Sequence, residues 1–166
     1  MNTATEKNVI GVWPGLHYRD GQAALKFLTE GLGFTVIASY EGAVEGSIAH
    51  AELSWPTGGG IMLGSADAKT QPDEFTALTD QRQSVYLVHD DPDSLIGRAI
   101  GAGAVVVRGL EDTDYGSRGF TVRDFEGNLW SVGTYAGAIS QSSTAVSTGC
   151  GAGVGICRLI SLDSPG

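Results

Sequence analysis

Apolar and polar positions in the N-terminal part of the chain follow a strand pattern, then a helix pattern, then three strand patterns. Residues 9–19, VIGVWPGLHYR, have strand character, and residues 21–33, GQAALKFLTEGLG, repeat apolar side chains at helical spacing and end in glycines. The next strands are predicted at residues 34–40, 44–55 and 60–64, separated by Gly, Glu-Gly and Pro-Thr-Gly turn signals. This part of the chain is therefore predicted to fold as a βαβββ unit.

The same order of patterns begins again in the second half. Residues 84–90, SVYLVHD, predict a strand, and residues 91–103, DPDSLIGRAIGAG, predict a helix that either Asp90 or Asp91 caps. Further strands are predicted at residues 104–109, 118–124 and 129–135. The turn between the last two strands, residues 124–128, has the sequence DFEGN.

The two halves align residue by residue. Asp20 aligns with Asp90, Leu25 with Leu95, Gly31 with Gly101 and Gly33 with Gly103, each pair being 70 positions apart. Aligned glycines after a helix are what a C-cap and a tight turn require, so the match concerns backbone geometry as well as composition. The pattern indicates an internal duplication of the βαβββ unit.

Two such units in tandem resemble the vicinal oxygen chelate superfamily, which includes glyoxalases, bleomycin-resistance proteins and extradiol dioxygenases. The resemblance is carried by residues 16–34, LHYRDGQAALKFLTEGLGF, and by residues 120–130, FTVRDFEGNLW. The second stretch is similar to the family's Asp-Pro-Glu/Asp-Gly-Asn turn, with Phe125 in the place of proline. The resemblance implies an α+β fold in which each unit forms a curled mixed sheet around a ligand cavity, and it implies a homodimer.

We predict one domain over residues 1–136, built from units at about 9–66 and 83–136. The resemblance does not cover the tail, residues 137–166, which is predicted to be flexible or to dock on a partner. Cys150 and Cys157 lie in this tail, too late in the chain to crosslink the main core, and we expect unpaired thiols.

Enzymes that the chain resembles typically hold a divalent metal with one imidazole, carboxylate or amide side chain from each of four strands. Those four positions fall here on Trp13, Glu52, Ser84 and Ser131. Only Glu52 among them is a good metal donor. We therefore predict no metal and no cofactor, which disfavours the metal-dependent glyoxalase, thiol-transferase and dioxygenase reactions. An unusual metal site of His17, His50 and Glu52 stays open as an alternative.

Two of these residues have a functional and a structural interpretation. Trp13 is either an aromatic wall on which a planar or cationic ligand stacks, or a core residue that fills the metal position. Glu52 is either a partly desolvated carboxylate that pairs with a ligand or acts as a base, or one half of a salt bridge to Arg118 or Arg123. The candidate ligand-binding residues are Trp13, His17, His50, Glu52, Trp55, Ser84, Tyr115, Arg118 and Ser131. Trp130 is predicted to pack in the core.

Composition and charge narrow the possible partners. The 166 residues carry a formal net charge of -9, with only ten Lys and Arg, which are scattered along the chain. Nucleic acid is therefore an unlikely partner, because phosphate binding needs clustered basic residues. No apolar run approaches the length of a membrane span, and no signal peptide is recognised, so we expect a cytoplasmic protein without membrane contact.

The leading hypothesis is a metal-independent small-molecule-binding protein that sequesters a hydrophobic or cationic compound, as in antibiotic resistance. The alternative is a lyase, isomerase or dioxygenase of the same fold that uses an unusual metal site or a Glu52 base. A third possibility is a structural protein whose own side chains fill the cavity.

Overall fold

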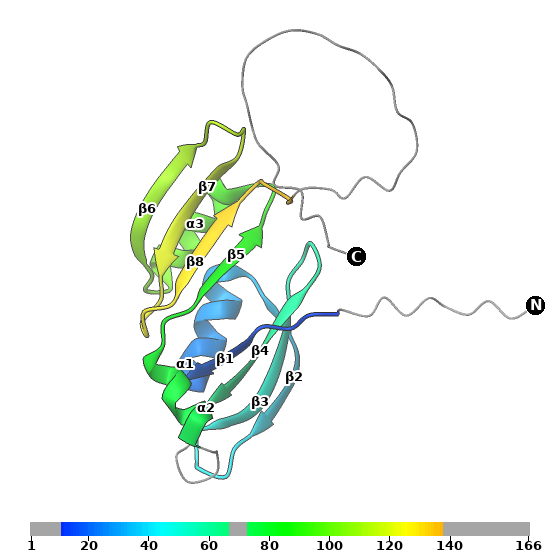
Figure 1. The fold of residues 1–166 in the computed structure, drawn as a ribbon, viewed down its shortest axis with the longest axis vertical. Coiled ribbons are helices and arrows are strands. Elements are labelled where there is room, and N and C mark those ends of the chain that lie inside the picture. Colours follow the sequence, from blue (N-terminus) through cyan, green and yellow to red (C-terminus); the bar gives the residue numbers. More distant parts are fainter. Residues whose placement is uncertain (1–10, 67–72, 138–166) are drawn as a thin grey trace, which may run out of the picture. The chain divides into compact units, whose positions relative to one another are not determined.

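A computed structural model describes residues 11–66 and 73–137 of the chain. The predicted strand start at Val9 and the predictions on the tail beyond residue 137, including Cys150 and Cys157, lie outside the described residues. The described part forms two modules, each with a four-stranded mixed sheet (Figure 1). The α+β fold with two βαβββ units is therefore confirmed.

The first module pairs its strands in the order β1-β4-β3-β2. Its elements are β1 Gly15–Tyr18, α1 Gly21–Lys26, the π-helical continuation η1 Phe27–Leu32, β2 Thr35–Glu41, β3 Ile48–Ser54 and β4 Gly60–Ser65. Strand β1 runs parallel to β4, whereas the other pairs are antiparallel. The strand predicted from residue 44 starts only at Ile48, because the backbone N–H of Gly42 bonds the carbonyl of Ser47 and Gly46 turns the chain with a φ of 78°.

The second module repeats this topology, with the strand order β5-β8-β7-β6 and β5 parallel to β8. Its elements are β5 Ser84–Val88, α3 Pro92–Gly101, β6 Val105–Asp112, β7 Arg118–Arg123 and β8 Leu129–Gly133. The connection between the modules contains a short helix that the sequence pattern did not predict, α2 Asp73–Ala77, and the 3₁₀ turn η2 Leu78–Asp80.

The helices of the two modules begin at an Asp cap and are followed by a glycine turn, although the caps, Asp20 and Asp91, are 71 rather than 70 positions apart. The Asp20 carboxylate accepts the N–H of Ala23 at 2.9 Å, and the Asp91 carboxylate accepts the N–H of Ser94 at 3.2 Å. Asp91, rather than Asp90, is thus the cap of α3. After the helices, Gly33 and Gly103 have φ values of 91° and 96°, which only glycine adopts without strain. The alignment of residues 70 positions apart therefore correctly paired the turns at Gly33 and Gly103.

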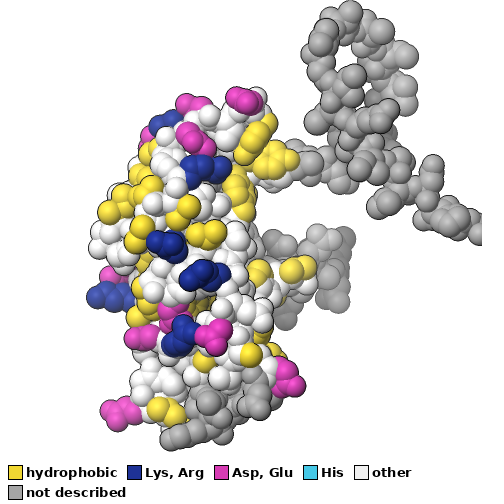
Figure 2. Space-filling model, turned by 60° about the vertical axis from the view of Figure 1, so that its left-hand side comes forward, with side chains coloured by type: hydrophobic (Ala, Val, Ile, Leu, Met, Phe, Trp, Pro, Cys, Tyr) yellow, Lys and Arg dark blue, Asp and Glu magenta, His cyan; other side chains and the backbone are white. Residues whose placement is uncertain are grey.

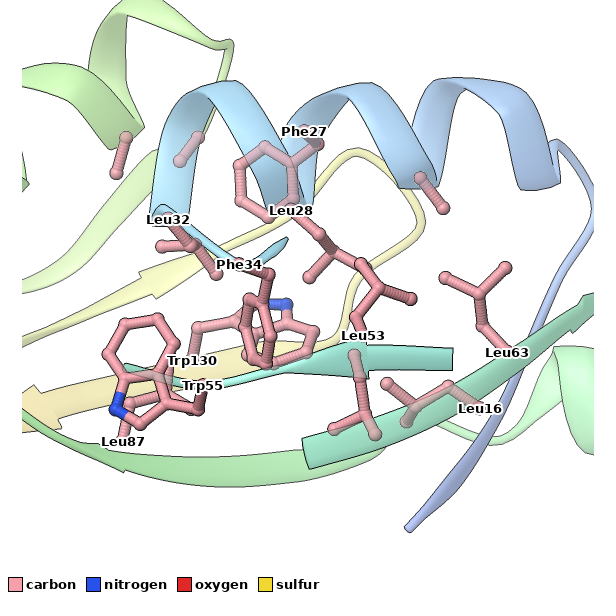
Figure 3. Close-up of a cluster of buried hydrophobic side chains, with 14 of the residues drawn as sticks. Leu16, Phe27, Leu28, Leu32, Phe34, Leu53, Trp55, Leu63, Leu87 and Trp130 are labelled. Atoms are coloured by element: carbon pink, nitrogen blue, oxygen red, sulfur yellow. The ribbon is translucent and has the colours of Figure 1, made fainter. Parts of the chain in front are cut away.

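The core lies between the helices and one side of each sheet. Side chains from the helix point toward the strands, as Figure 3 shows for Phe27 and Leu28 above Leu53. Phe34 packs against two indoles, with ring centroids 4.8 Å from Trp55 and 6.1 Å from Trp130. Trp130 is fully buried, which confirms its predicted place in the core.

A buried polar cluster joins the two modules. The carboxylate of Asp124, in the β7–β8 turn, accepts the Tyr18 hydroxyl at 2.8 Å and the Trp130 indole N–H at 3.1 Å. Burial, together with the Asp124 charge, raises the pKa of Tyr18. In the same turn, the Glu126 carboxylate accepts the backbone N–H groups of Arg19 and Asp20, both at 2.9 Å. The DFEGN turn of the second module thus holds the β1–α1 corner of the first.

Candidate functional site

The first sheet has a side opposite α1, which we call the first open face. Its residues alternate with the buried residues of the same strands, and His17 of β1, Met62 of β4 and Glu52 of β3 lie on it. Cross-strand pairing places Met62 directly opposite Glu52, and Tyr40 of β2 directly opposite His50 of β3. The predicted residues His17, His50 and Glu52 therefore share this face.

Trp13 reaches the first open face just before β1. A Cβ atom added to Gly60 on this face would run into the indole ring of Trp13, so the ring lies directly over the Gly60 backbone. Glycine at position 60 is what allows this close approach. The indole is partly exposed rather than buried in the core. Trp13 thus covers one end of the face that carries Met62 and Glu52.

Glu52 and His50 form a pair on this face. The Nε2 atom of His50 lies 3.1 Å from Oε1 of Glu52, and the two side chains are 41% and 33% exposed. The ring of Tyr40 stacks on His50 with a centroid distance of 6.3 Å. The observed partner of Glu52 is therefore a histidine of its own strand and not Arg118 or Arg123.

His17 occupies the part of the first open face nearest the linking helix α2. Its ring lies 5.4 Å from the ring of Phe75, centroid to centroid. Burial lowers the pKa of His17, so the imidazole is neutral at pH 7. Its Nδ1 atom is buried and has no hydrogen-bond partner within residues 11–66 and 73–137. Because this nitrogen is buried, a ligand could bond it only after neighbouring side chains move.

The second sheet has an equivalent side opposite α3, the second open face. Pairing across the strands gives one row of four residues on it, Arg108, Thr121, Ser131 and Tyr86, and a parallel row of Val105, Arg123, Leu129 and Ser84. The hydroxyls of Thr121 and Ser131 lie 3.0 Å apart. The structure thus brings the predicted residues Ser84 and Ser131 to one face.

Arg108 and Arg123 were missed by the sequence-based search for ligand contacts. Arg123 stands two residues after Thr121 and alternates with the buried Phe120 and Val122. This alternation was the signal that could have placed it on the same side as Ser131.

Three predicted residues lie elsewhere. Trp55 is 6% exposed, and its indole N–H donates to the carbonyl of Val88 at 2.7 Å. The Arg118 guanidinium binds the Asp93 carboxylate of α3 at 2.7 and 2.8 Å. Tyr115, in the β6–β7 loop, is 69% exposed and packs edge-on against Tyr135 at 5.9 Å. Trp55 nevertheless lines a groove together with Gly60 and Tyr86 of the open faces, whereas Arg118 and Tyr115 make their side-chain contacts elsewhere.

The sequence matches the family model of the Glyoxalase/Bleomycin resistance protein/Dioxygenase superfamily over residues 12–132. The chain belongs to this superfamily. The match covers both modules, and members of the superfamily bind small molecules.

Several solved structures are similar to this chain in fold. TioX from Micromonospora sp. ML1 is 29% identical, with a TM-score of 0.60 over 74% of this chain and 98% of its own. A superfamily enzyme from Burkholderia phytofirmans PsJN is 19% identical (TM-score 0.54, 73% and 94% covered). A glyoxalase-related enzyme from Fulvimarina pelagi is 20% identical (TM-score 0.56, 75% and 88% covered). At such identities the last two support the fold alone. No curated protein sequence matches the chain significantly.

The four positions that the resemblance assigns to metal ligands are divided between the two faces. Trp13 and Glu52 lie on the first open face, and Ser84 and Ser131 on the second. Indole and uncharged hydroxyl groups are poor donors for zinc, nickel, iron or manganese. In the part of the chain that the structure describes, no three His, Cys, Asp or Glu side chains come close enough together to hold a metal ion. The residues present therefore do not fit the family's metal, and His17 does not complete a site with His50 and Glu52.

An apolar groove lies where the first module meets β5. It has a volume of about 300 Å³, and its lining includes Pro14 and Gly60 on one side and Val85 and Tyr86 on the other. Trp13 adjoins it through Pro14 and Gly60. An apolar ligand can therefore find recessed surface next to the Trp13 indole. Among the described residues, no helix is long and apolar enough to cross a membrane.

Proposed function

We propose that this protein is a metal-independent small-molecule-binding protein that sequesters a hydrophobic compound with a planar part. The observation that carries the proposal is the Trp13 indole, which lies over Gly60 at a position where superfamily enzymes place a metal ligand. Further ring and thioether side chains lie on the same open face, namely His17, Tyr40, His50 and Met62. Aromatic walls with few polar groups are typical of sites that bind by apolar burial and stacking.

We also propose that the protein forms a homodimer. The two sheets of one chain are not paired with each other; the modules meet through their helices, through the Asp124 cluster and through the hydrogen bond from Trp55 to Val88. Both open faces leave large aromatic side chains in contact with solvent, with Tyr40 62% and Tyr86 47% exposed. A second copy that brings its second open face over the first open face would bury these rings and form the cavity. The proposal also places the protein in the cytoplasm and the end of its domain at residue 136.

The alternative function is a lyase or isomerase reaction in which Glu52 acts as a base. The observation that favours it is the pair of Glu52 and His50, because an imidazole 3.1 Å from a carboxylate can orient it and share its proton. This reading requires turnover that depends on the Glu52 carboxylate, whereas sequestration requires only binding.

A neutral planar probe tests the proposed binding site. We expect 2-naphthamide to bind to the wild-type protein in isothermal titration calorimetry. Removing one stacking indole costs about 0.5 to 1.5 kcal/mol, so Trp13→Ala should weaken the affinity by about 2- to 13-fold. Ser131→Ala removes only a hydroxyl and should change the affinity less. Equal losses in the two variants, with both folded by circular dichroism, would contradict the assignment of Trp13.

Metal content provides an independent check of the same proposal. Protein prepared without a polyhistidine tag and without chelator is expected to contain less than about a tenth of an equivalent of zinc, nickel, iron or manganese by elemental mass spectrometry, because only one of the four positions holds a strong donor. A near-stoichiometric metal would contradict the proposal, because it would require a metal site that the four positions do not supply.

A further inference from the structure

The two open faces differ in charge, although the chain as a whole is acidic. Arg108 and Arg123 lie on the second open face, in a protein that has only ten Lys and Arg against 19 Asp and Glu. On the first open face, the carboxylate of Glu52 already has the His50 imidazole as its partner. Figure 2, in which the left-hand side of Figure 1 comes forward, shows basic and acidic side chains among hydrophobic ones. Two guanidinium groups, those of Arg108 and Arg123, lie on one of the two proposed ligand-facing surfaces.

Most other arginines in the described part of the chain are engaged in holding the fold. Arg98 donates to the carbonyl of Glu30 at 3.0 Å, and Arg118 is fixed by Asp93 and Asp112. Arg19 binds Asp80 and approaches Glu126. These contacts join elements of the fold and leave little capacity for a ligand.

Arg123 is different. It is exposed on β7, and within residues 11–66 and 73–137 no ion pair forms at its guanidinium. Arg108 contacts Glu111 at 3.2 Å, but both side chains are about half exposed, and such surface pairs contribute little. Both guanidinium groups are thus available to a stronger anionic partner.

Hydroxyl groups complete the donor set around the two arginines. Thr121 and Ser131 are hydrogen-bonded to each other between Arg108 and Tyr86, and Ser84 lies in the same row as Arg123. Guanidinium groups flanked by hydroxyls match the geometry and charge of an oxyanion, and charge-assisted hydrogen bonds of this kind are among the strongest in proteins.

We infer that the sequestered compound carries an anionic oxygen group, such as a carboxylate, which Arg123 and Arg108 bind while the planar part of the compound lies against Trp13. The inference rests on the proposed function and replaces the cationic ligand expected from the net charge. The charge of a whole protein does not determine the charge of one face, and here the face that carries the hydroxyl row also carries two guanidinium groups.

Three probes with one ring system and different charges test this inference: 2-naphthoate, 2-naphthamide and 2-naphthylmethylamine. A charge-assisted hydrogen bond contributes about 1.5 to 3 kcal/mol, so 2-naphthoate should bind the wild type at least about 10-fold more tightly than 2-naphthamide. Arg123→Gln should reduce this preference to about 3-fold or less, because it weakens 2-naphthoate binding much more than 2-naphthamide binding. Lys26→Gln removes the same charge from the exposed surface of α1 and should preserve the preference.

The possible outcomes separate this inference from the proposed function. Wild-type protein that binds all three probes equally, or prefers the amine, would overturn the inference and leave the binding function standing. A preference for 2-naphthoate that survives both Arg123→Gln and Arg108→Gln would overturn the assignment to these residues. Failure of all three probes to bind would overturn the proposed function and the inference together. Circular dichroism of each variant confirms that a loss of binding is not a loss of folding.

Discussion

At the scale of a single residue, the buried carboxylate of Asp124 contributes to the stability of the fold. Its side chain is 4% exposed, yet it accepts the hydroxyl of Tyr18 and the side-chain N–H groups of Asn128 and Trp130, all buried. It also accepts the backbone N–H groups of Glu126 and Asn128. A buried carboxylate is tolerated only when donors surround it in this way. The charge of Asp124 is thus stabilised by residues of both modules.

Removing this carboxylate should destabilise the whole domain. Asp124→Ala leaves three buried side-chain donors without an acceptor, and each such donor costs about 1 to 3 kcal/mol, so we expect a loss of at least about 3 kcal/mol in the free energy of unfolding. Urea denaturation measures it. Asp114→Ala, at an exposed loop position, is the matched control and should stay within about 0.5 kcal/mol of the wild type. A loss below about 1 kcal/mol in Asp124→Ala would show that the cluster is not needed.

At the scale of elements, apolar periodicity predicted the strands and the two main helices, because each has one buried and one exposed side. The same alternation shows which candidate residues lie on the helix side of a sheet and which lie on an open face. Trp55 is two residues after the buried Leu53, and Arg118 is two residues before the buried Phe120, so both lie on the helix side of their sheets. The short helix α2 could not be predicted, because its residues lack a long apolar repeat.

Two glycines of the second module should respond to alanine in opposite ways. Gly103 ends the α3 turn with a φ of 96°, so Gly103→Ala should lower the free energy of unfolding by about 1 kcal/mol. Gly97 lies inside α3, is exposed, and leaves open space for a Cβ. Gly97→Ala should therefore stabilise by about 0.5 to 1 kcal/mol. Thermal unfolding of both variants measures the effects, and shifts of the same sign would contradict this account of the helix.

At the scale of the whole molecule, the proposed cavity needs residues from two sheets. Within one chain these sheets are not paired with each other. Trp13 lies on the first open face and Arg123 on the second, and the sheets are separate within the chain. If each cavity combines the first face of one protomer with the second face of its partner, the dimer contains two cavities. Each cavity then takes its Trp13 and its Arg123 from different chains.

A mixed dimer tests this arrangement. In a heterodimer of Trp13→Ala and Arg123→Gln chains, purified with two different affinity tags, one shared cavity retains both residues and the other lacks both. We therefore expect one high-affinity site for 2-naphthoate per heterodimer, with wild-type affinity, although each parent homodimer binds weakly. If each cavity belonged to a single chain, every cavity of the heterodimer would lack one residue and no wild-type site would appear. A species with the mass of a monomer in light scattering would contradict the dimer itself, because no partner would then supply the second face.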